Sequence, residues 1–186
     1  MTAEMPIVDA IQSLLNRKRP ENRDIGECVV AIESVPRLGF TGHHTCALRA
    51  FRELNIPAEL ATGVFWGQGL TRNIEKHLRD GTRYVLTLDY DTVFTARDIT
   101  TLYNLMQGDR SIDALAAMQQ QRGRGRALFM RTDETGVYWL PVTPSELSEP
   151  LLRVKTAHFG LTMFRTGSFA KVRKPWFAAT PSEDGG

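Results

Sequence analysis

The stretch YVLTLDYDTVF, residues 84–94, decides the fold that the sequence predicts. Its first half is an apolar run typical of a strand buried on both faces of a parallel sheet. The run ends in Asp89-Tyr90-Asp91, at the carboxyl edge of the sheet, where open α/β sheets bind ligands. If the chain stays extended, both carboxylates point to one side and repel each other unless a cation is near. Hard oxygen ligands suit Mg²⁺ or Mn²⁺, so the pattern predicts a metal–diphosphate site, with a pair of turn-forming aspartates as the alternative.

Strand and helix patterns alternate around this stretch. In order, the sequence predicts a helix over 7–15, a polar connector over 21–27, a strand over 28–34, a helix over 41–54, a strand over 58–66, a loop and helix over 67–81, the strand over 83–91, a helix over 96–106 and a strand over 112–120. Thr95 and Asp98 have the spacing of a capping box. Beyond residue 120, short strands and loops follow. The alternation predicts an α/β protein, a Rossmann-like three-layer α/β/α sandwich with a mainly parallel central sheet.

The composition limits the classes of function. The chain has 186 residues, 42% hydrophobic and 24% charged, close to the averages of globular proteins. A disordered chain, a collagen-like repeat and a disulfide scaffold are therefore excluded. The net charge of +2 is no strong signal for nucleic acid or a membrane surface. Cys28 and Cys46 form no disulfide framework, and no apolar run approaches the ~20 residues of a membrane span, so we expect a cytoplasmic protein with no membrane segment.

In their order along the chain, these segments resemble a glycosyltransferase of GT-A fold, of the family-2-like kind in the nucleotide-diphospho-sugar transferase superfamily. Residues 28–36 resemble the strand that opens the nucleotide pocket, and residues 69–94 resemble an Arg-Asn helix followed by the Asp-x-Asp strand. Residues 154–177, which close on Pro-Trp-Phe, resemble the acceptor side, and Ser-Glu-Asp at 182–184 resembles the start of the motif with the catalytic base. The resemblance implies a metal-dependent hexosyltransferase that uses a UDP- or GDP-sugar and an unidentified acceptor, and it favours inversion.

The resemblance also implies roles for residues on the donor side. Asp91 is expected to be the direct ligand of Mn²⁺ or Mg²⁺, and Asp89 is expected to contact the ribose or sugar of the donor beside that metal. Arg72 and Asn73 are expected near the donor. The residues expected to border the nucleobase are Glu33, Ser34 and Pro36.

On the acceptor side, the resemblance implies that Asp184, or Glu183 beside it, is the general base that deprotonates the acceptor hydroxyl. An arginine of the loop over 122–126 is expected to neutralise the diphosphate or hold the acceptor.

The expected organisation is a helix and connector over 1–27 and one GT-A-like domain over 28–186, divided into a nucleotide-binding part over 28–120 and an acceptor part over 121–186. Because related enzymes continue beyond the Glu-Asp motif, we expect a domain truncated at its C-terminus.

Two other classes of function compete with this interpretation. Asp89-Tyr90-Asp91-Thr92 also fits a phosphatase of the haloacid-dehalogenase type, with Asp89 as nucleophile, Asp91 as acid/base and Lys171 or Lys174 as the phosphate lysine. That motif normally lies on the first strand of its domain, whereas here a strand–helix–strand unit precedes it. The second alternative is a non-catalytic module that binds a sugar nucleotide. No P-loop motif is present, which excludes an NTPase of that kind.

Two adjacent histidines, His43 and His44, lie at the start of the helix over 41–54. Neighbouring side chains on a helix point about 100° apart, so the pair does not easily share a metal. The sequence therefore favours a position on the helix surface for both.

Overall fold

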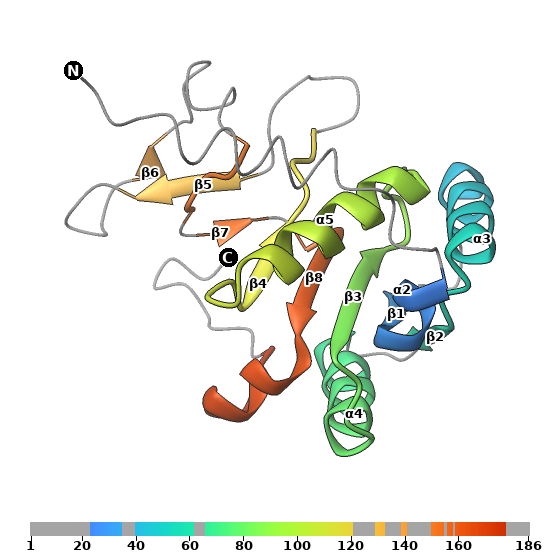
Figure 1. Cartoon of the computed structure of the whole chain (residues 1–186). Helices are drawn as coiled ribbons and strands as arrows, with labels where there is room; N and C mark the ends of the chain where they lie inside the picture. Colours follow the sequence, from blue (N-terminus) through green and yellow to red (C-terminus); the bar gives the residue numbers. More distant parts are fainter. Residues whose placement is uncertain are drawn as a thin grey trace.

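A five-stranded mixed sheet organises the chain (Figure 1). The computed structural model describes residues 23–34, 40–61, 66–120, 129–132, 139–140, 150–154, 156–157 and 159–177. In spatial order, the strands are β2 (Ala58–Ala61), β1 (Val29–Ser34), β3 (Tyr84–Asp89), β8 (Leu161–Arg165) and β4 (Ala114–Ala116). β1 pairs in parallel with β2 and β3, whereas β8 is antiparallel to both β3 and β4. The predicted α/β class is confirmed, with one antiparallel strand inside the sheet.

Four strands end at one edge of this sheet, which we call the carboxyl edge. β1, β2 and β3 run in the same direction, and β4 shares it because β4 and β3 are both antiparallel to β8. Ser34 at the end of β1 is paired with Asp89 at the end of β3. β8 enters the sheet at the carboxyl edge and leaves it at the opposite edge, where Arg165 pairs with Tyr84.

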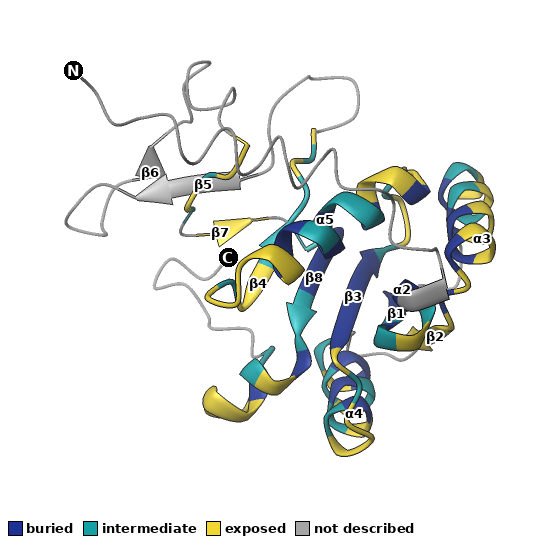
Figure 2. Ribbon diagram, viewed as in Figure 1, coloured by how far each residue is buried: buried dark blue, intermediate teal, exposed yellow. Residues whose placement is uncertain are grey.

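Helices cover both faces of the sheet (Figure 1). α2 (Arg23–Cys28), α3 (Thr41–Leu54) and α5 (Ala96–Gly108) pack on one face, in a core that includes Leu86 and Leu88. α4 (Trp66–Arg79) and the 3₁₀ helix η2 (Thr166–Lys171) pack on the other, in a core that includes Val85. Successive side chains of a strand point to opposite faces, so an unbroken apolar strand serves both cores. Figure 2 accordingly shows β3 buried along most of its length.

Local sequence signals account for two of the helices. α3 begins and ends where the sequence predicts, and the chain leaves it through Asn55 in the left-handed region at φ 54°. Asparagine is the residue that tolerates this conformation best after glycine. The capping box before α5 is confirmed, because the Thr95 amide donates to Asp98 Oδ2 at 2.8 Å and the Asp98 amide donates to Thr95 Oγ1 at 3.4 Å.

Several predicted boundaries were wrong. The segment expected as a polar connector over 21–27 contains α2, because Ile25 is fully buried in the core and packing overrides the weak local pattern. The strand expected over 58–66 ends at Ala61, and Trp66 already belongs to α4. The strand expected over 112–120 is limited to β4. The strand expected over 83–91 stops at Asp89, where the chain turns.

The second half of the chain contains a small three-stranded antiparallel sheet in the order β6-β5-β7. This agrees with the short strands that the sequence predicts beyond residue 120. Its strands are β5 (Phe129–Thr132), β6 (Trp139–Leu140) and β7 (Thr156–Ala157). The helix expected over 7–15 and the loop over 122–126 lie outside the described residues. Among the helices that are described, none has the length and apolarity needed to cross a membrane.

Gly26 tests the packing of α2 against the end of α3. A Cβ atom at this position would lie 2.1 Å from the carbonyl oxygen of Asn55, a backbone atom that has no freedom to move aside. We expect Gly26→Ala to lower the free energy of unfolding by about 1–3 kcal/mol, as for other overpacked sites. Urea unfolding measures the change. Gly167→Ala is the matched control, because a Cβ there meets nothing within 4 Å; equal stabilities of the two variants would contradict the packing.

Glu59 on β2 tests the contact between β2 and α4. Burial opposes ionisation of this carboxyl, but Lys76 and His77 outweigh burial, so the pKa of Glu59 is lowered from 4.5. A depressed pKa stabilises the fold above the unfolded value, and this contribution is lost as the pH falls through the folded value. We expect the parent to be more stable than Glu59→Gln at about pH 6, with a smaller difference at about pH 3.5. A constant difference in urea unfolding would contradict this.

Candidate functional site

The Asp-x-Asp segment forms a turn at the carboxyl edge. Asp89 is the last residue of β3, and the Thr92 amide donates to its carbonyl at 3.2 Å, which closes a turn over Asp89–Thr92. The expectation that Asp89-Tyr90-Asp91 stays extended was therefore wrong. The chain turns here because it must reverse to enter α5 at Thr95. Asp89 is partly buried at the end of the strand, whereas Asp91 is exposed on the turn.

The start of β8 holds this turn from the other side. The Asp89 amide donates to the carbonyl of Gly160 at 3.1 Å. A Cβ atom on Gly160 would lie 2.4 Å from Oγ1 of Thr92 and 2.7 Å from Oε1 of Gln119. Real Cβ atoms essentially never approach this closely, so the absence of a side chain at Gly160 lets β8 approach the turn.

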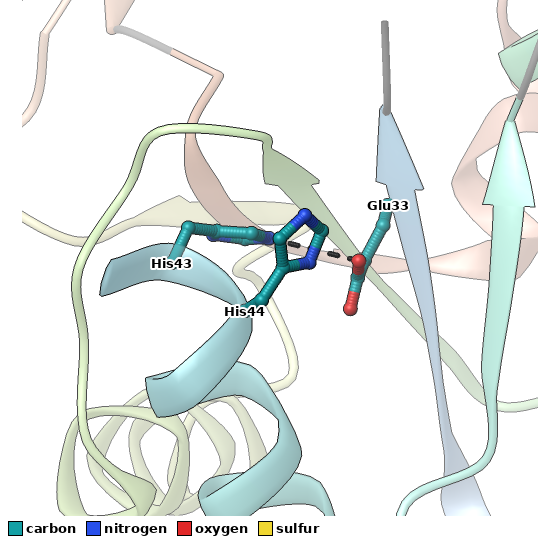
Figure 3. Close-up of side chains that lie close together, drawn as sticks. All are labelled: Glu33, His43 and His44. Carbon is teal, nitrogen blue, oxygen red and sulfur yellow. Dashed lines mark ion pairs between the residues drawn. The ribbon is translucent and has the colours of Figure 1, made fainter. Parts of the chain in front are cut away.

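His43, near the start of α3, contacts the Asp89–Thr92 turn. This side chain is fully buried, and its Nδ1 lies 2.8 Å from the Thr92 carbonyl oxygen, to which it donates. Its Nε2 lies 3.6 Å from Oε2 of Glu33, the fifth residue of β1, which is 6% exposed (Figure 3). Burial alone lowers the pKa of His43, but Glu33, the Thr92 carbonyl and the charge of Asp91 outweigh it, so the pKa of His43 is raised.

His44 completes a cluster with Glu33 and His43. One possible ligand atom from each of the three residues lies within 4.8 Å of the others. The sequence pattern favoured a surface position for both histidines, and this was wrong for His43, since α3 packs its first turn onto the end of β1. One signal for the cluster was present in the sequence. Glu33 stands near the end of an apolar strand, where a buried carboxylate requires a partner.

Cys46 provides a further link between α3 and the segment after the turn. Its thiol donates to the carbonyl of His43 at 3.1 Å, and its sulfur accepts from the amide of Phe94 at 3.4 Å. The Phe94 ring packs 6.0 Å from the His43 ring, measured between centroids. The position of His43 is therefore set by its own helix and by the segment 92–94 together.

The other expected site residues are not all brought to the edge. Arg72 is exposed and Asn73 half-buried in the middle of α4, about 9 Å along the axis from its first residue at 1.5 Å per residue. The backbone of Ser34 is paired with that of Asp89. Pro36, Glu183 and Asp184 lie outside the described residues, as do the arginines of the loop over 122–126.

The strand order places these groups at a topological switch point. After β1, the chain passes through α3 to β2 on one side, and after β3 it passes through α5 to β4 on the other. Since α3 and α5 pack on the same face, the two connections diverge above the neighbouring ends of β1 and β3. Ligands of open α/β sheets bind in the crevice that such a divergence creates. Glu33, His43 and the turn over Asp89–Thr92 all lie at this point, and His43 contacts both Glu33 and Thr92.

A second concave region lies on the α5 side of the sheet. It is a cleft of about 710 Å³ between α5, β4 and residues 150–154, 156–157 and 159. Its lining is mostly apolar and includes Leu102, Leu115, Leu151 and Phe159. Phe159 directly precedes Gly160, so this cleft begins close to the carboxyl edge.

The fold and this edge define an α/β protein with acidic groups at a topological switch point. No protein-family model and no curated protein matches the sequence. Among solved structures, the chain is similar to the crystal structure of A197 from STIV, with a TM-score of 0.55. The sequences are 12% identical, and the match covers 81% of this chain and 71% of the other. At this identity, the similarity supports the α/β fold alone.

Gly160→Ala tests the contact between β8 and the turn. Because the added Cβ would overlap Thr92 Oγ1, we expect the turn to shift and the amide chemical shifts of Asp89 and Thr92 to change clearly in a nitrogen–proton correlation spectrum. We also expect a loss of about 1–3 kcal/mol of stability. Gly167→Ala, at the other end of β8, is the control and should leave both amides unchanged. Changes confined to the neighbours of residue 160 in sequence would contradict the contact.

Proposed function

We propose that this chain is a GT-A-type glycosyltransferase domain that binds a nucleotide-diphospho-sugar together with Mn²⁺ or Mg²⁺ at the Asp89–Asp91 turn. The observation that carries the proposal is the position of this turn. It stands at the end of the central strand β3, beside the end of β1, where the connections through α3 and α5 diverge. A crevice of this kind is the common location of nucleotides in α/β proteins.

The carboxylate ligands at the turn suit a hard divalent cation. Asp91 is exposed on the turn, Asp89 lies at the end of the strand, and carboxylate oxygens are preferred ligands of Mg²⁺ and Mn²⁺. The raised pKa of His43 reflects in part the negative charge of Asp91, so the crevice already favours positive charge. A cation bound there would supply neutralisation of the diphosphate leaving group. Asp91 would hold the cation, and Asp89 would orient the donor beside it.

The chain after β8 returns to the carboxyl edge before the Glu-Asp pair that is proposed to supply the general base. η2 begins at the edge opposite to Asp89, and the chain then runs back along α4, where Lys174 pairs with Glu75. It reaches the first turn of α4 at Phe177, whose carbonyl oxygen would lie 2.6 Å from a Cβ on Gly67. Phe177 is thus back at the carboxyl edge, seven residues before Asp184, a length of chain that spans at most about 25 Å.

The same course weakens the phosphatase alternative. Lys171 pairs with Asp113, which precedes β4, and both lie at the edge opposite to Asp89. The two edges are separated by the length of β3, about 16 Å at the rise of an extended strand. Lys174 is paired with Glu75 in the middle of α4. A phosphate lysine has to reach the phosphorylated aspartate directly, so neither of these lysines suits that role.

Nucleotide titration tests the proposal. We expect calorimetry to detect micromolar binding of UDP or GDP in the presence of Mn²⁺ and none with EDTA. Asp91→Asn should abolish the metal-dependent binding, because an amide lacks the charge that holds the cation. Asp80→Asn is the matched control, since Asp80 is an exposed aspartate at the opposite end of α4.

The outcomes separate the classes of function. Unchanged affinity in Asp91→Asn would remove the metal–diphosphate argument, and no binding of either nucleotide would overturn the proposal. Binding without hydrolysis or transfer of the corresponding sugar would favour the non-catalytic module instead. Turnover that is lost in Asp184→Asn with binding retained would support Asp184 as the general base.

A further inference from the structure

We propose that Glu33, His43 and His44 form a binding site for a transition-metal dication of the Zn²⁺ or Co²⁺ kind, separate from the Asp89–Asp91 turn. Figure 3 shows the three side chains, with Glu33 on the end of β1 and both histidines on the first turn of α3. This proposal goes beyond the proposed function, because it rests on a different set of residues and on no nucleotide.

The hydrogen bonding of His43 is the first argument. A backbone carbonyl can only accept, so the Nδ1 atom that lies 2.8 Å from the Thr92 oxygen must carry the proton. Nε2 then faces the cluster, in a side chain that is fully buried, and it has no hydrogen-bond partner. A histidine that ligates a metal through one ring nitrogen typically donates the other N–H to a carbonyl or carboxylate in this way.

The spacing of the ligand atoms is the second argument. His43 Nε2 and Glu33 Oε2 are 3.6 Å apart, which is too long for a good hydrogen bond. Neighbouring ligands of a tetrahedral Zn²⁺ with bonds of ~2.0–2.1 Å are separated by ~3.4 Å, close to this distance. The third ligand atom, from His44, is within 4.8 Å of the other two, so a side-chain rotation of His44 brings it into the same shell.

Burial is the third argument. Glu33 is 6% exposed and His43 is fully buried, so a carboxylate and a ring nitrogen face each other away from water at a distance too long for a good hydrogen bond. A dication between them satisfies both groups. His44 is partly exposed and leaves the cluster open toward solvent, which provides access for the ion and room for a water as the fourth ligand.

The mixture of ligands selects the metal. Two imidazoles and one carboxylate suit Zn²⁺ and its neighbours in the first transition row, whereas Mg²⁺ prefers oxygen ligands only. The cluster therefore differs in preference from the pair of aspartates on the turn. A metal here would fix the start of α3 to the end of β1, and through the His43–Thr92 hydrogen bond it would fix the turn as well.

A second buried histidine shows what the cluster has in addition. His77 on α4 is 5% exposed, and its Nε2 lies 3.1 Å from Oε2 of Glu59. Lys76 pairs with the same carboxylate, and the described residues supply no further histidine, cysteine or carboxylate close enough to complete a group of three. His77 thus shares the burial and the carboxylate of His43 without forming a site, and it serves as the matched control.

The test is metal titration of the full chain, prepared without a histidine tag and stripped of metal. Zn²⁺ affinity is measured by competition with a chromophoric chelator, and Co²⁺ binding by its visible absorption, both without nucleotide. We expect one Zn²⁺ bound with micromolar or tighter affinity. His44→Ala and Glu33→Gln should each weaken binding at least about tenfold, since even outer-shell partners of a metal are worth about 10–100-fold. His77→Gln should bind as the parent does.

The outcomes are distinct from those of the nucleotide experiment. Equal Zn²⁺ affinity in His44→Ala and the parent would overturn the site, as would the absence of binding in a folded parent. Loss of binding in Asp91→Asn with retention in His44→Ala would assign the metal to the turn and also overturn it. Because His44 is partly exposed, His44→Ala should keep the parent's circular dichroism spectrum, so weaker binding would not reflect unfolding. A failure of nucleotide binding leaves these measurements valid.

Discussion

The parallel pairing of β1 with β3 is the constraint on which the rest of the structure depends. It runs from Val29 opposite Tyr84 to Ser34 opposite Asp89, so the two strands end side by side. The candidate site follows from this alignment of the two strand ends. The buried Glu33 and the Asp-x-Asp turn come from segments more than fifty residues apart in sequence, yet they lie at the same edge of the sheet because two apolar strands share a register.

The turn at the carboxyl edge is held in place by short polar contacts as well as by the sheet. His43 donates to the Thr92 carbonyl, Cys46 accepts from the Phe94 amide, and Gly160 admits the start of β8 beside the turn. These contacts connect α3, the turn and β8, which arrive from three parts of the chain. The position of Asp91 is therefore determined by packing around the turn, in addition to the strand that precedes it.

The sequence predicted those features whose cause is local. The apolar strand before Asp89, the helix over 41–54 and the capping box at Thr95 each depend on residues within one element, and all were found. The wrong predictions concern segments whose structure is decided by contacts with residues far away in the sequence. α2 forms because Ile25 is buried by other elements, and the turn after Asp89 reflects the approach of Gly160, seventy residues later. The antiparallel direction of β8 had no signature in its own residues.

The same reasoning explains why the histidine cluster escaped prediction. On an isolated helix, His43 and His44 point apart, and this geometry is correct. The helix geometry alone does not show that Glu33 approaches the first turn of α3 from β1. Glu33 brings a third possible ligand atom within 4.8 Å of one from each histidine. Spacing within one element does not detect a cluster whose third member comes from another element.

The distribution of charge indicates why the carboxyl edge should attract cations. Glu33, Asp89 and Asp91 gather at this edge, where Glu33 is paired with His43, whereas Lys171 and Lys174 are paired elsewhere with Asp113 and Glu75. Like charges that share a partly desolvated crevice raise the free energy of the folded state unless a cation compensates them. The two proposals assign different cations to this edge, a hard one to the aspartates of the turn and a softer one to the histidine cluster. The His43–Thr92 hydrogen bond connects the two groups directly, so a metal at either group would stabilise the geometry of the other.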